Sequence, residues 1–568
     1  MADDIPPGFN SVAAKLDEYF ENWLRKALDD SAGHEQEGLI ELVRSADLHA
    51  YFLNCFGNSE LSTELMSKCR FIVHGIGPIL RVFLPVLEKF ADGIPWIPSS
   101  TSTAKWADQI LYEAGRLSIL RRLSHSERYG LVRCEFHSDE HVAIHVLGRD
   151  AESIDRDDHV WLVNKMLEEK KEYHDHLDQQ IKGWARDRID QYVGIHREHF
   201  ICYDSDRELL GLYQDYVQRL MIQSAEADAF PDDVRIGSRT FAEWKWIATT
   251  AAARTCLHLS FATRLSTLNG ERLDLRNLLT NFVRVEDLRE IWRQQLDDIT
   301  ETELDDIEDI FMLTAKHAEE YFSNHDCPLP YNIRFGKYFA LLPQFGYLNN
   351  TCTFLVTELK RKYREDWDRV VNLREAKFQQ DLYKLLPIEQ YVIGRENASI
   401  RRAAGNTETD IDAVLFERST NCIYLFQLKW FDVFAHSLRE RQSKLRNLLD
   451  KGNKWVEQIC DWVSNTSQSE ILSKLDLQGK GIHADSLEIR TVVLTRFSAR
   501  FSGEHRYDER AAWLSWPRLC RLMSESQRHD APLEAAWQKA KEDTNAVPQE
   551  PSSHTEYLFH GMKVDVYD

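Results

Sequence analysis

The segment Thr409–Trp430, TDIDAVLFERSTNCIYLFQLKW, constrains the fold more than any other part of the sequence. Two runs rich in β-branched and aromatic residues flank the polar stretch ERSTN, a pattern typical of an antiparallel hairpin. With the turn centred between positions 419 and 420, Asp412 faces Gln427 across the two strands. Because both faces are apolar near the turn, the sequence predicts a hairpin that is buried on both sides.

One face of this hairpin becomes polar at its open end, where Asp410 is expected to face Lys429 beyond the pair Asp412 and Gln427. Burying a charge without a partner costs several kcal/mol, so the cluster predicts a bound ligand, and a cation is the natural one for Asp412. The alternative is structural. In that case Asp410 and Lys429 form an ion pair, while Asp412 and Gln427 are hydrogen-bonded at the margin of the sheet.

The whole chain divides into three regions. Residues 1–350 show apolar residues at helical spacing over most of their length and predict a mainly α-helical region of one or two subdomains. Prolines and glycines gather in Cys327–Asn350, which marks the junction. Residues 351–530 follow the order helix, strand, hairpin, helix, strand, helix, which predicts an α/β domain. Residues 531–568 are expected to be a polar tail, so the chain is predicted to be a multidomain protein.

The net charge of −22 is unevenly distributed. Residues 1–356 contain 38 Lys and Arg against 59 Asp and Glu, whereas residues 357–530 contain 29 against 26. A phosphate-binding surface is therefore disfavoured in the front region and allowed in the rear one. No run reaches the ~18 uninterrupted apolar residues of a membrane span, and the N-terminus lacks the pattern of a signal peptide. We therefore expect a cytoplasmic protein with no membrane partner.

Within residues 365–525 the sequence resembles the PD-(D/E)xK nuclease superfamily, in particular its Mrr-like branch with a QxK motif. TDIDAVLF resembles the strand with the first catalytic aspartate, IYLFQLKW the strand that ends in (D/E/Q)xK, and AKFQQDLYKLL the first helix of the family. VVLTRFSARFSG and WLSWPRLCRLM resemble the later strand and the closing helix. The resemblance implies a restriction-endonuclease-like domain with a mixed central sheet. No family resemblance is found in residues 1–350.

The resemblance also implies roles for individual residues. Asp412, Gln427 and the backbone carbonyl of Leu428 would hold Mg²⁺ or Mn²⁺, and Lys429 would be the catalytic lysine. Gln427 is neutral where most members have an acid, and Gln379 stands where many relatives have a glutamate. Since Mg²⁺ prefers charged oxygen ligands, neighbouring carboxylates would have to compensate. The candidate accessory acids are Asp410, Glu408 and Glu375.

A nucleic-acid substrate needs cations around this site. The loop before the hairpin and the helix after it supply them, and the candidates are Arg395, Arg401, Arg402, Arg439, Lys444, Lys451 and Lys454. The aromatic residues Trp430, Phe431 and Trp455 lie among them and suit contact with a phosphate backbone. A further basic cluster, Lys360–Arg364, is equally well explained as a solvated helix face.

The resemblance therefore implies a metal-dependent DNA endonuclease of prokaryotic restriction or antiphage defence. The helical region would regulate it, as a sensor, through a homo-oligomer or through a regulatory partner. The sequence does not separate RNA from DNA as the substrate. The alternative is a non-catalytic scaffold that keeps the nuclease fold to bind nucleic acid or protein. Gln427 and Gln379 favour this alternative, and Lys429 disfavours it.

Overall fold

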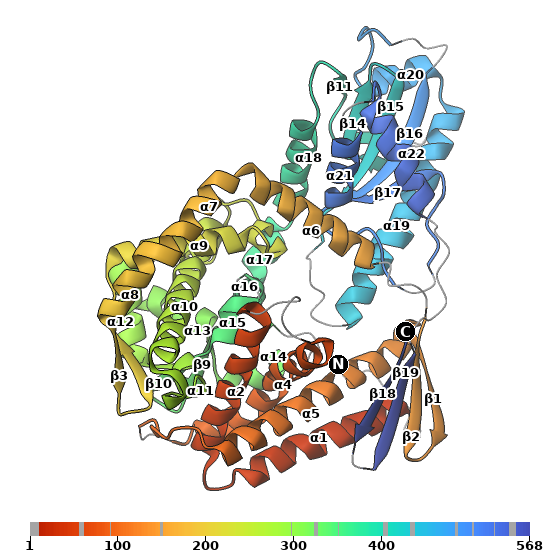
Figure 1. Ribbon diagram of the computed structural model, residues 1–568. Helices are drawn as coiled ribbons and strands as arrows, with labels where there is room; N and C mark the ends of the chain where they lie inside the picture. The colour runs from red at the N-terminus through yellow and green to blue at the C-terminus, as the bar shows by residue number, and fades with distance from the viewer. Residues whose placement is uncertain are drawn as a thin grey trace. The chain divides into compact units, whose positions relative to one another are not determined.

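A computed structural model describes residues 11–55, 62–90, 93–147, 152–296, 298–322, 328–349, 352–401, 407–431, 438–482, 487–502, 505–526, 529–544, 553–559 and 561–567 (Figure 1). The chain forms two compact units, and each unit is built from separate stretches of the sequence. Unit 1 comprises Met1–His125, Lys170–Asp228 and Asp232–Asp368; unit 2 comprises Ser126–Glu169, Ala229–Pro231 and Arg369–Asp568. The main division therefore follows residue 368, whereas the sequence places it after residue 350.

Unit 1 is mainly helical, in agreement with the spacing of its apolar residues. Its first helix begins after Ser11, whose side chain accepts a hydrogen bond from the backbone N–H of Ala14 at 3.1 Å. The helices are α1 (Val12–Asp30), α2 (Glu35–Cys55), α4 (Thr63–Leu87), α5 (Thr101–His125), α7 (Lys171–Gln180), α8 (Arg186–Tyr192), α9 (Arg207–Met221), α10 (Phe241–Asn269), α11 (Arg276–Leu279), α12 (Val285–Gln295), α13 (Glu301–Phe311), α14 (Ala315–Phe322), α15 (Gln344–Asn349) and α16 (Thr353–Lys362).

Helix α4 is long and apolar enough to cross a membrane by length and composition, and 56% of its most apolar window is buried inside the fold. It packs closely against α5, as glycines on both helices show. A Cβ atom at Gly75 would lie 2.1 Å from the carbonyl oxygen of Leu111, and one at Gly115 would lie 1.9 Å from that of Phe71. The two backbones therefore approach at positions that only glycine can occupy.

Small sheets complete unit 1. One has the strand order β7-β10-β9-β8, and two are hairpins. The strands are β3 (Val193–His196), β4 (Phe200–Tyr203), β5 (Arg235–Ile236), β6 (Arg239–Thr240), β7 (Asn281–Arg284), β8 (Met312–Leu313), β9 (Asn332–Phe335) and β10 (Phe339–Leu342).

Unit 2 contains a five-stranded mixed sheet with the order β11-β14-β15-β16-β17. Strands β11, β14 and β15 are antiparallel to one another, whereas β15, β16 and β17 are parallel. Their bounds are β11 (Tyr391–Ile393), β14 (Ala413–Glu417), β15 (Cys422–Lys429), β16 (Glu488–Thr495) and β17 (Ala511–Ser515). Beside them lies the two-stranded ribbon β12 (Ala398–Arg401) and β13 (Thr407–Ile411). An α/β unit with a mixed sheet thus follows the mainly helical region.

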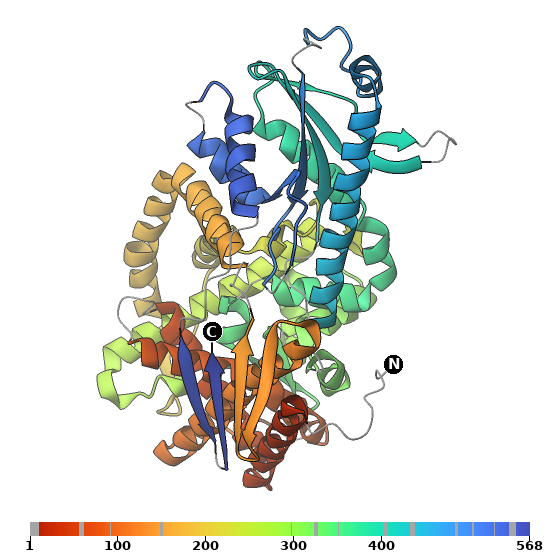
Figure 2. The same ribbon diagram turned by 90° about the vertical axis from the view of Figure 1, so that its right-hand side faces the viewer.

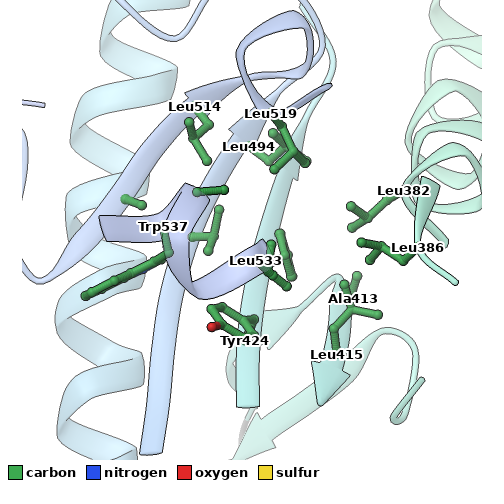
Figure 3. Close-up of a cluster of buried hydrophobic side chains, with 14 of the residues drawn as sticks. Leu382, Leu386, Ala413, Leu415, Tyr424, Leu494, Leu514, Leu519, Leu533 and Trp537 are labelled. Carbon is green, nitrogen blue, oxygen red and sulfur yellow. The ribbon is translucent and has the colours of Figure 1, made fainter. Parts of the chain in front are cut away.

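Helices cover both faces of this sheet. Side chains of α18 (Leu373–Leu385), α21 (Trp516–Glu525) and α22 (Pro532–Thr544) meet one face, as Figure 3 shows for Leu382, Leu519 and Trp537. The long helix α19 (Leu438–Asn465) and α20 (Gln468–Lys474) pack on the other face (Figure 2). Alternate residues of β14 and β15 enter the two cores, which explains why this hairpin is apolar on both sides.

The residues after 530 have more structure than a polar tail. Leu533, Ala536 and Trp537 of α22 are buried in the core of the α/β unit. Strands β18 (His554–Phe559) and β19 (Met562–Tyr567) join β1 (Val132–Ser138) and β2 (His141–Val146) in a sheet with the order β1-β2-β19-β18. Nothing local in the sequence links these two hairpins, because they are about 400 residues apart along the chain.

Helix α6 (Glu152–Glu169) also belongs to unit 2, although the sequence assigns it to the front region. Its buried Asp158 lies 3.4 Å from Arg518 and 3.1 Å from Arg521, two residues of α21. The single helix that the sequence predicts at the start of residues 351–530 is instead divided into α16, α17 (Arg364–Val370) and α18.

Candidate active site

Strands β14 and β15 pair in the register that the sequence predicts. Val414 lies opposite Leu425, and Ala413 lies opposite Phe426. Every residue of β14 is buried, as are those of β15 up to Leu428. The two strands therefore form the centre of the α/β unit, and the candidate residues follow at the ends where their pairing stops.

The pairing stops at Asp412, where the chain bends between β13 and β14. The backbone N–H of Asp412 donates to the carbonyl of Phe426 at 3.0 Å. Strand β13 then leaves the sheet and pairs with β12, which places Asp410 opposite Ser399. The predicted pairing of Asp410 with Lys429 across the hairpin is therefore wrong. Trp455 of α19 donates from its indole N–H to the carbonyl of Asp410 at 2.6 Å and holds the segment in this new direction.

The Asp412 carboxylate lies against the end of β15. Its Oδ2 accepts hydrogen bonds from Nε2 of Gln427 at 2.5 Å and from the backbone N–H of Leu428 at 2.6 Å. The side chains of Asp412 and Gln427 therefore converge as expected. This contact also agrees with the structural alternative, in which these two residues bond to each other at the sheet margin.

Helix α18 brings two further side chains to the same place. Gln379 is buried and donates from its amide to the backbone carbonyl of Asp412. Glu375 lies one turn earlier on the same helix face. In the sequence, Gln379 stands out only as a departure from the family pattern. Its spacing of four residues from Glu375 nevertheless indicates that the two side chains lie on the same face of the helix.

Charge interactions connect these groups. Burial raises the pKa of Glu375, as do the charges of Asp412 and Asp410, while the charge of Lys429 lowers it. Burial likewise raises the pKa of Asp412; Lys429 and the Leu428 N–H lower it, and Asp410 raises it. Three carboxylates and one ammonium group are thus close enough to influence one another. The carboxylates repel each other, and a further cation would relieve this repulsion.

The aromatic residues near the site belong to the core. Trp430 is only 7% exposed and contacts both the ring of Phe378 and the guanidinium of Arg496. Trp455 is only 2% exposed. The expectation that both contact a phosphate backbone is therefore wrong, because neither indole face is open to a polymer.

The predicted basic residues have different environments. Arg395 and Arg401 are exposed before the bend, and Arg439, Lys451 and Lys454 are exposed on α19. Lys444 on the same helix is half-buried. Arg402 and the side chain of Glu408 lie outside the described residues. In the second basic cluster, Arg361 and Lys362 are half-buried and form ion pairs with Asp309 at 3.2 and 2.9 Å, so these two side chains do not belong to a solvated helix face.

The candidate metal ligands at the bend are oxygen atoms, which are the ligands that a hard divalent cation prefers. Within the described residues, no three His, Cys, Asp or Glu side chains are grouped closely enough to hold an ion together. An ion here would depend on Asp412, an amide oxygen and a backbone oxygen. The Gln427 amide now directs its nitrogen at Asp412, so its two ends would have to exchange places for the oxygen to act as a ligand.

Comparison of the chain with protein-family models, with curated proteins and with solved structures finds no match.

Proposed function

We propose that the protein is a metal-dependent endonuclease that hydrolyses phosphodiester bonds, with its active site at the Asp412 bend of unit 2. One observation supports this most strongly. The bend places the Asp412 carboxylate against Gln427 and Leu428, within electrostatic reach of Lys429 and Glu375. Repelling carboxylates gathered around the half-buried Asp412, beside a lysine, are unfavourable for stability alone, and such groups are concentrated at functional sites.

Each residue has a defined task in this proposal. Asp412 and the oxygens of Gln427 and Leu428 hold Mg²⁺ or Mn²⁺, and Glu375 and Asp410 add negative charge around them. A bound divalent ion would lower the pKa of water and neutralise charge that develops on the phosphate. Lys429 orients the attacking water or binds a phosphate oxygen, since its ammonium carries a compact charge on a flexible stem. Gln379 fixes the Asp412 backbone through its hydrogen bond.

The second candidate is a non-catalytic scaffold with the same fold. The observation that favours it is that Asp412 Oδ2 already accepts two hydrogen bonds from the protein itself. A carboxylate satisfied in this way can serve structure alone. In that case Lys429 has no chemical task.

Incubation with supercoiled plasmid separates the two candidates. We expect cutting in Mg²⁺ or Mn²⁺, none with a chelator, and a loss of at least about 100-fold in Lys429→Ala. Lys539→Ala is the matched control, because Lys539 is an exposed lysine on α22 of the same unit. No cutting by the wild type under any condition, or equal cutting by both variants, contradicts the proposed function.

The same digestion on single- and double-stranded RNA decides whether the substrate is DNA, as we propose, or RNA. We further propose a role in restriction or antiphage defence. Cells that express the wild type should then reduce phage plating relative to cells that express Lys429→Ala, and equal plating contradicts this role.

A further inference from the structure

The carboxyl ends of β15, β16 and β17 lie at one edge of the mixed sheet. The three strands are parallel, and Lys429, Thr495 and Ser515 are direct neighbours at their ends. Adjacent strands are about 4.8 Å apart, so the backbone of Ser515 lies about 10 Å from that of Lys429 along this edge. Ligands of such sheets usually bind at the carboxyl edge. The segments that follow the three strands therefore border the candidate active site.

Helix α6 lies at this edge, because Asp155 bonds to the segment after β16 and Asp158 to α21, which follows β17. Together with Glu152 they form a row of acids spaced three residues apart on one side of the helix. Each acid pairs with arginine, and the partners are Arg441, Arg500, Arg518 and Arg521. A row of anions against arginines is also the charge pattern of a nucleic-acid backbone on its binding surface.

The ion pairs of this row differ in how deeply they are buried. Asp155 is 3% exposed and Asp158 is 1% exposed, and breaking buried pairs of this kind is strongly destabilising. By contrast, the side chain of Glu152 is 31% exposed and that of its partner Arg441 is 14% exposed. A pair that water reaches stabilises less. The two aspartates therefore hold α6 in place, whereas Arg441 can exchange the carboxylate of Glu152 for another anion.

Arg441 belongs to the basic stretch that follows the active-site strand. It lies two residues after Arg439, which the sequence predicts to bind nucleic acid. Arg439 is exposed, whereas Arg441 is half-buried and donates to Oε1 of Glu152. The guanidinium of Arg441 also lies over the ring of Phe501, 5.7 Å from its centre. Since Phe501 belongs to the segment after β16, this contact places the guanidinium at the edge that carries the candidate site.

We propose that Arg441 binds a phosphate of the nucleic-acid backbone and that Glu152 blocks it in the free protein. This inference rests on the proposed function, because it concerns access of the substrate backbone to the same site. A phosphate oxygen takes the place of Oε1 of Glu152, since arginine binds carboxylates and phosphates through the same N–H groups. Nucleic acid therefore competes with an acid of the protein itself, and the affinity of the site is lower than its cations alone would give.

Binding of a fluorescent DNA duplex in the presence of a chelator tests this without any cutting. Glu152→Gln keeps the size of the side chain and frees Arg441 from a charged partner. We expect the variant to bind DNA about two- to fivefold more tightly than wild type. One more phosphate contact should also steepen the slope of log K against log salt concentration by about 0.9. Asp157→Asn is the matched control, because it removes one negative charge at an exposed position of the same helix.

The double variant Glu152→Gln/Arg441→Gln separates the release of Arg441 from a general effect of charge. Without the guanidinium, Glu152→Gln should change DNA binding no more than Asp157→Asn does. The proposal is overturned if Glu152→Gln has the same dissociation constant and salt slope as the control. An undiminished gain in the double variant also overturns it, because the gain would then not pass through Arg441.

These measurements fail independently of the proposed function. If wild type cuts plasmid and Glu152→Gln binds DNA like the control, the nuclease stands and the block at Arg441 is wrong. If no variant cuts and Glu152→Gln binds DNA more tightly, the block is correct in a protein that only binds nucleic acid. Absence of DNA binding by every variant overturns both.

Discussion

Asp155 on α6 provides the sharpest test of how unit 2 is built. The carboxylate is 3% exposed and accepts hydrogen bonds from Ala499 and Arg500. Its Oδ2 bonds to the backbone N–H groups of Ala499 and Arg500, both at 2.9 Å, and its Oδ1 bonds to Nη1 of Arg500 at 3.0 Å. Asp155→Ala leaves a buried guanidinium and two buried N–H groups without partners. Breaking a buried ion pair in this way costs about 3–5 kcal/mol.

That loss is a large share of the stability of a folded unit, which is typically about 5–15 kcal/mol. Hydrogen exchange of the amides in β15 and β16 reports on unit 2 alone, since these strands lie at its centre. We expect their exchange to show the full loss in Asp155→Ala, and little change in Asp157→Ala, a matched control at an exposed position of the same helix. A difference below about 1 kcal/mol between Asp155→Ala and wild type would refute the view that α6 is part of this unit.

Two further predictions concern stability. Burial raises the pKa of Asp47 in unit 1 to about 7 from its ordinary 3.8. This carboxyl contributes its full stabilisation at pH values below the pKa that it has in the unfolded chain. That stabilisation, about 4 kcal/mol, is lost as the pH rises through 7. Asp47→Asn should therefore have a higher melting temperature than wild type at about pH 8 and the same melting temperature near pH 4. A difference between the two melting temperatures that stays constant across this pH range would contradict the raised pKa of Asp47. Gly452→Ala should destabilise unit 2 by about 1–3 kcal/mol in urea unfolding, because the new Cβ would lie 2.5 Å from the Trp513 ring. An unchanged free energy of unfolding would show that α19 can move away from Trp513.

The hairpin register could be predicted because its determinants are local. Side chains alternate between the two faces of a strand, so a shift by one residue would move every apolar side chain of β14 to the other face. The convergence of Asp412 and Gln427 follows from that register and from their equal distance from the turn. The first helix of the chain could be predicted for the same reason, since Ser11 and the apolar spacing after it are local signals.

Other features depend on contacts between distant residues. The bend at Asp412 occurs because β13 finds a different partner in β12, and Trp455 of α19 holds it there. The inclusion of residues 126–169 in unit 2 depends on Asp155 and Asp158 meeting arginines more than 340 positions later. Pairings of this range leave no periodic pattern in the sequence.

Because residues 126–169 belong to unit 2, a C-terminal fragment lacks part of that unit. A truncated chain that starts at residue 351 retains the mixed sheet and the Asp412 bend but lacks α6, β1 and β2. Any change in its activity would combine the loss of unit 1 with damage to unit 2. Point substitutions in the full chain are therefore the sounder test of regulation by the helical region.

Gln427 offers the most direct test of whether the bend holds a cation. The residue is 6% exposed, and its amide nitrogen lies 2.5 Å from Asp412 Oδ2. In Gln427→Glu two carboxylates share this buried space. Two unit charges about 4 Å apart repel by about 4 kcal/mol at an effective dielectric constant of about 20. Without a divalent ion the variant should therefore melt well below wild type.

A divalent ion should reverse this effect, because the new carboxylate is a better ligand than an amide. We expect added Mg²⁺ to raise the melting temperature of Gln427→Glu by more than that of wild type and to restore most of the loss. Gln468→Glu, at an exposed position of α20, is the control for general effects of charge. If Mg²⁺ shifts the variant, the control and wild type equally, then the carboxylates at the bend do not bind a cation, and the scaffold explains the site better than the nuclease.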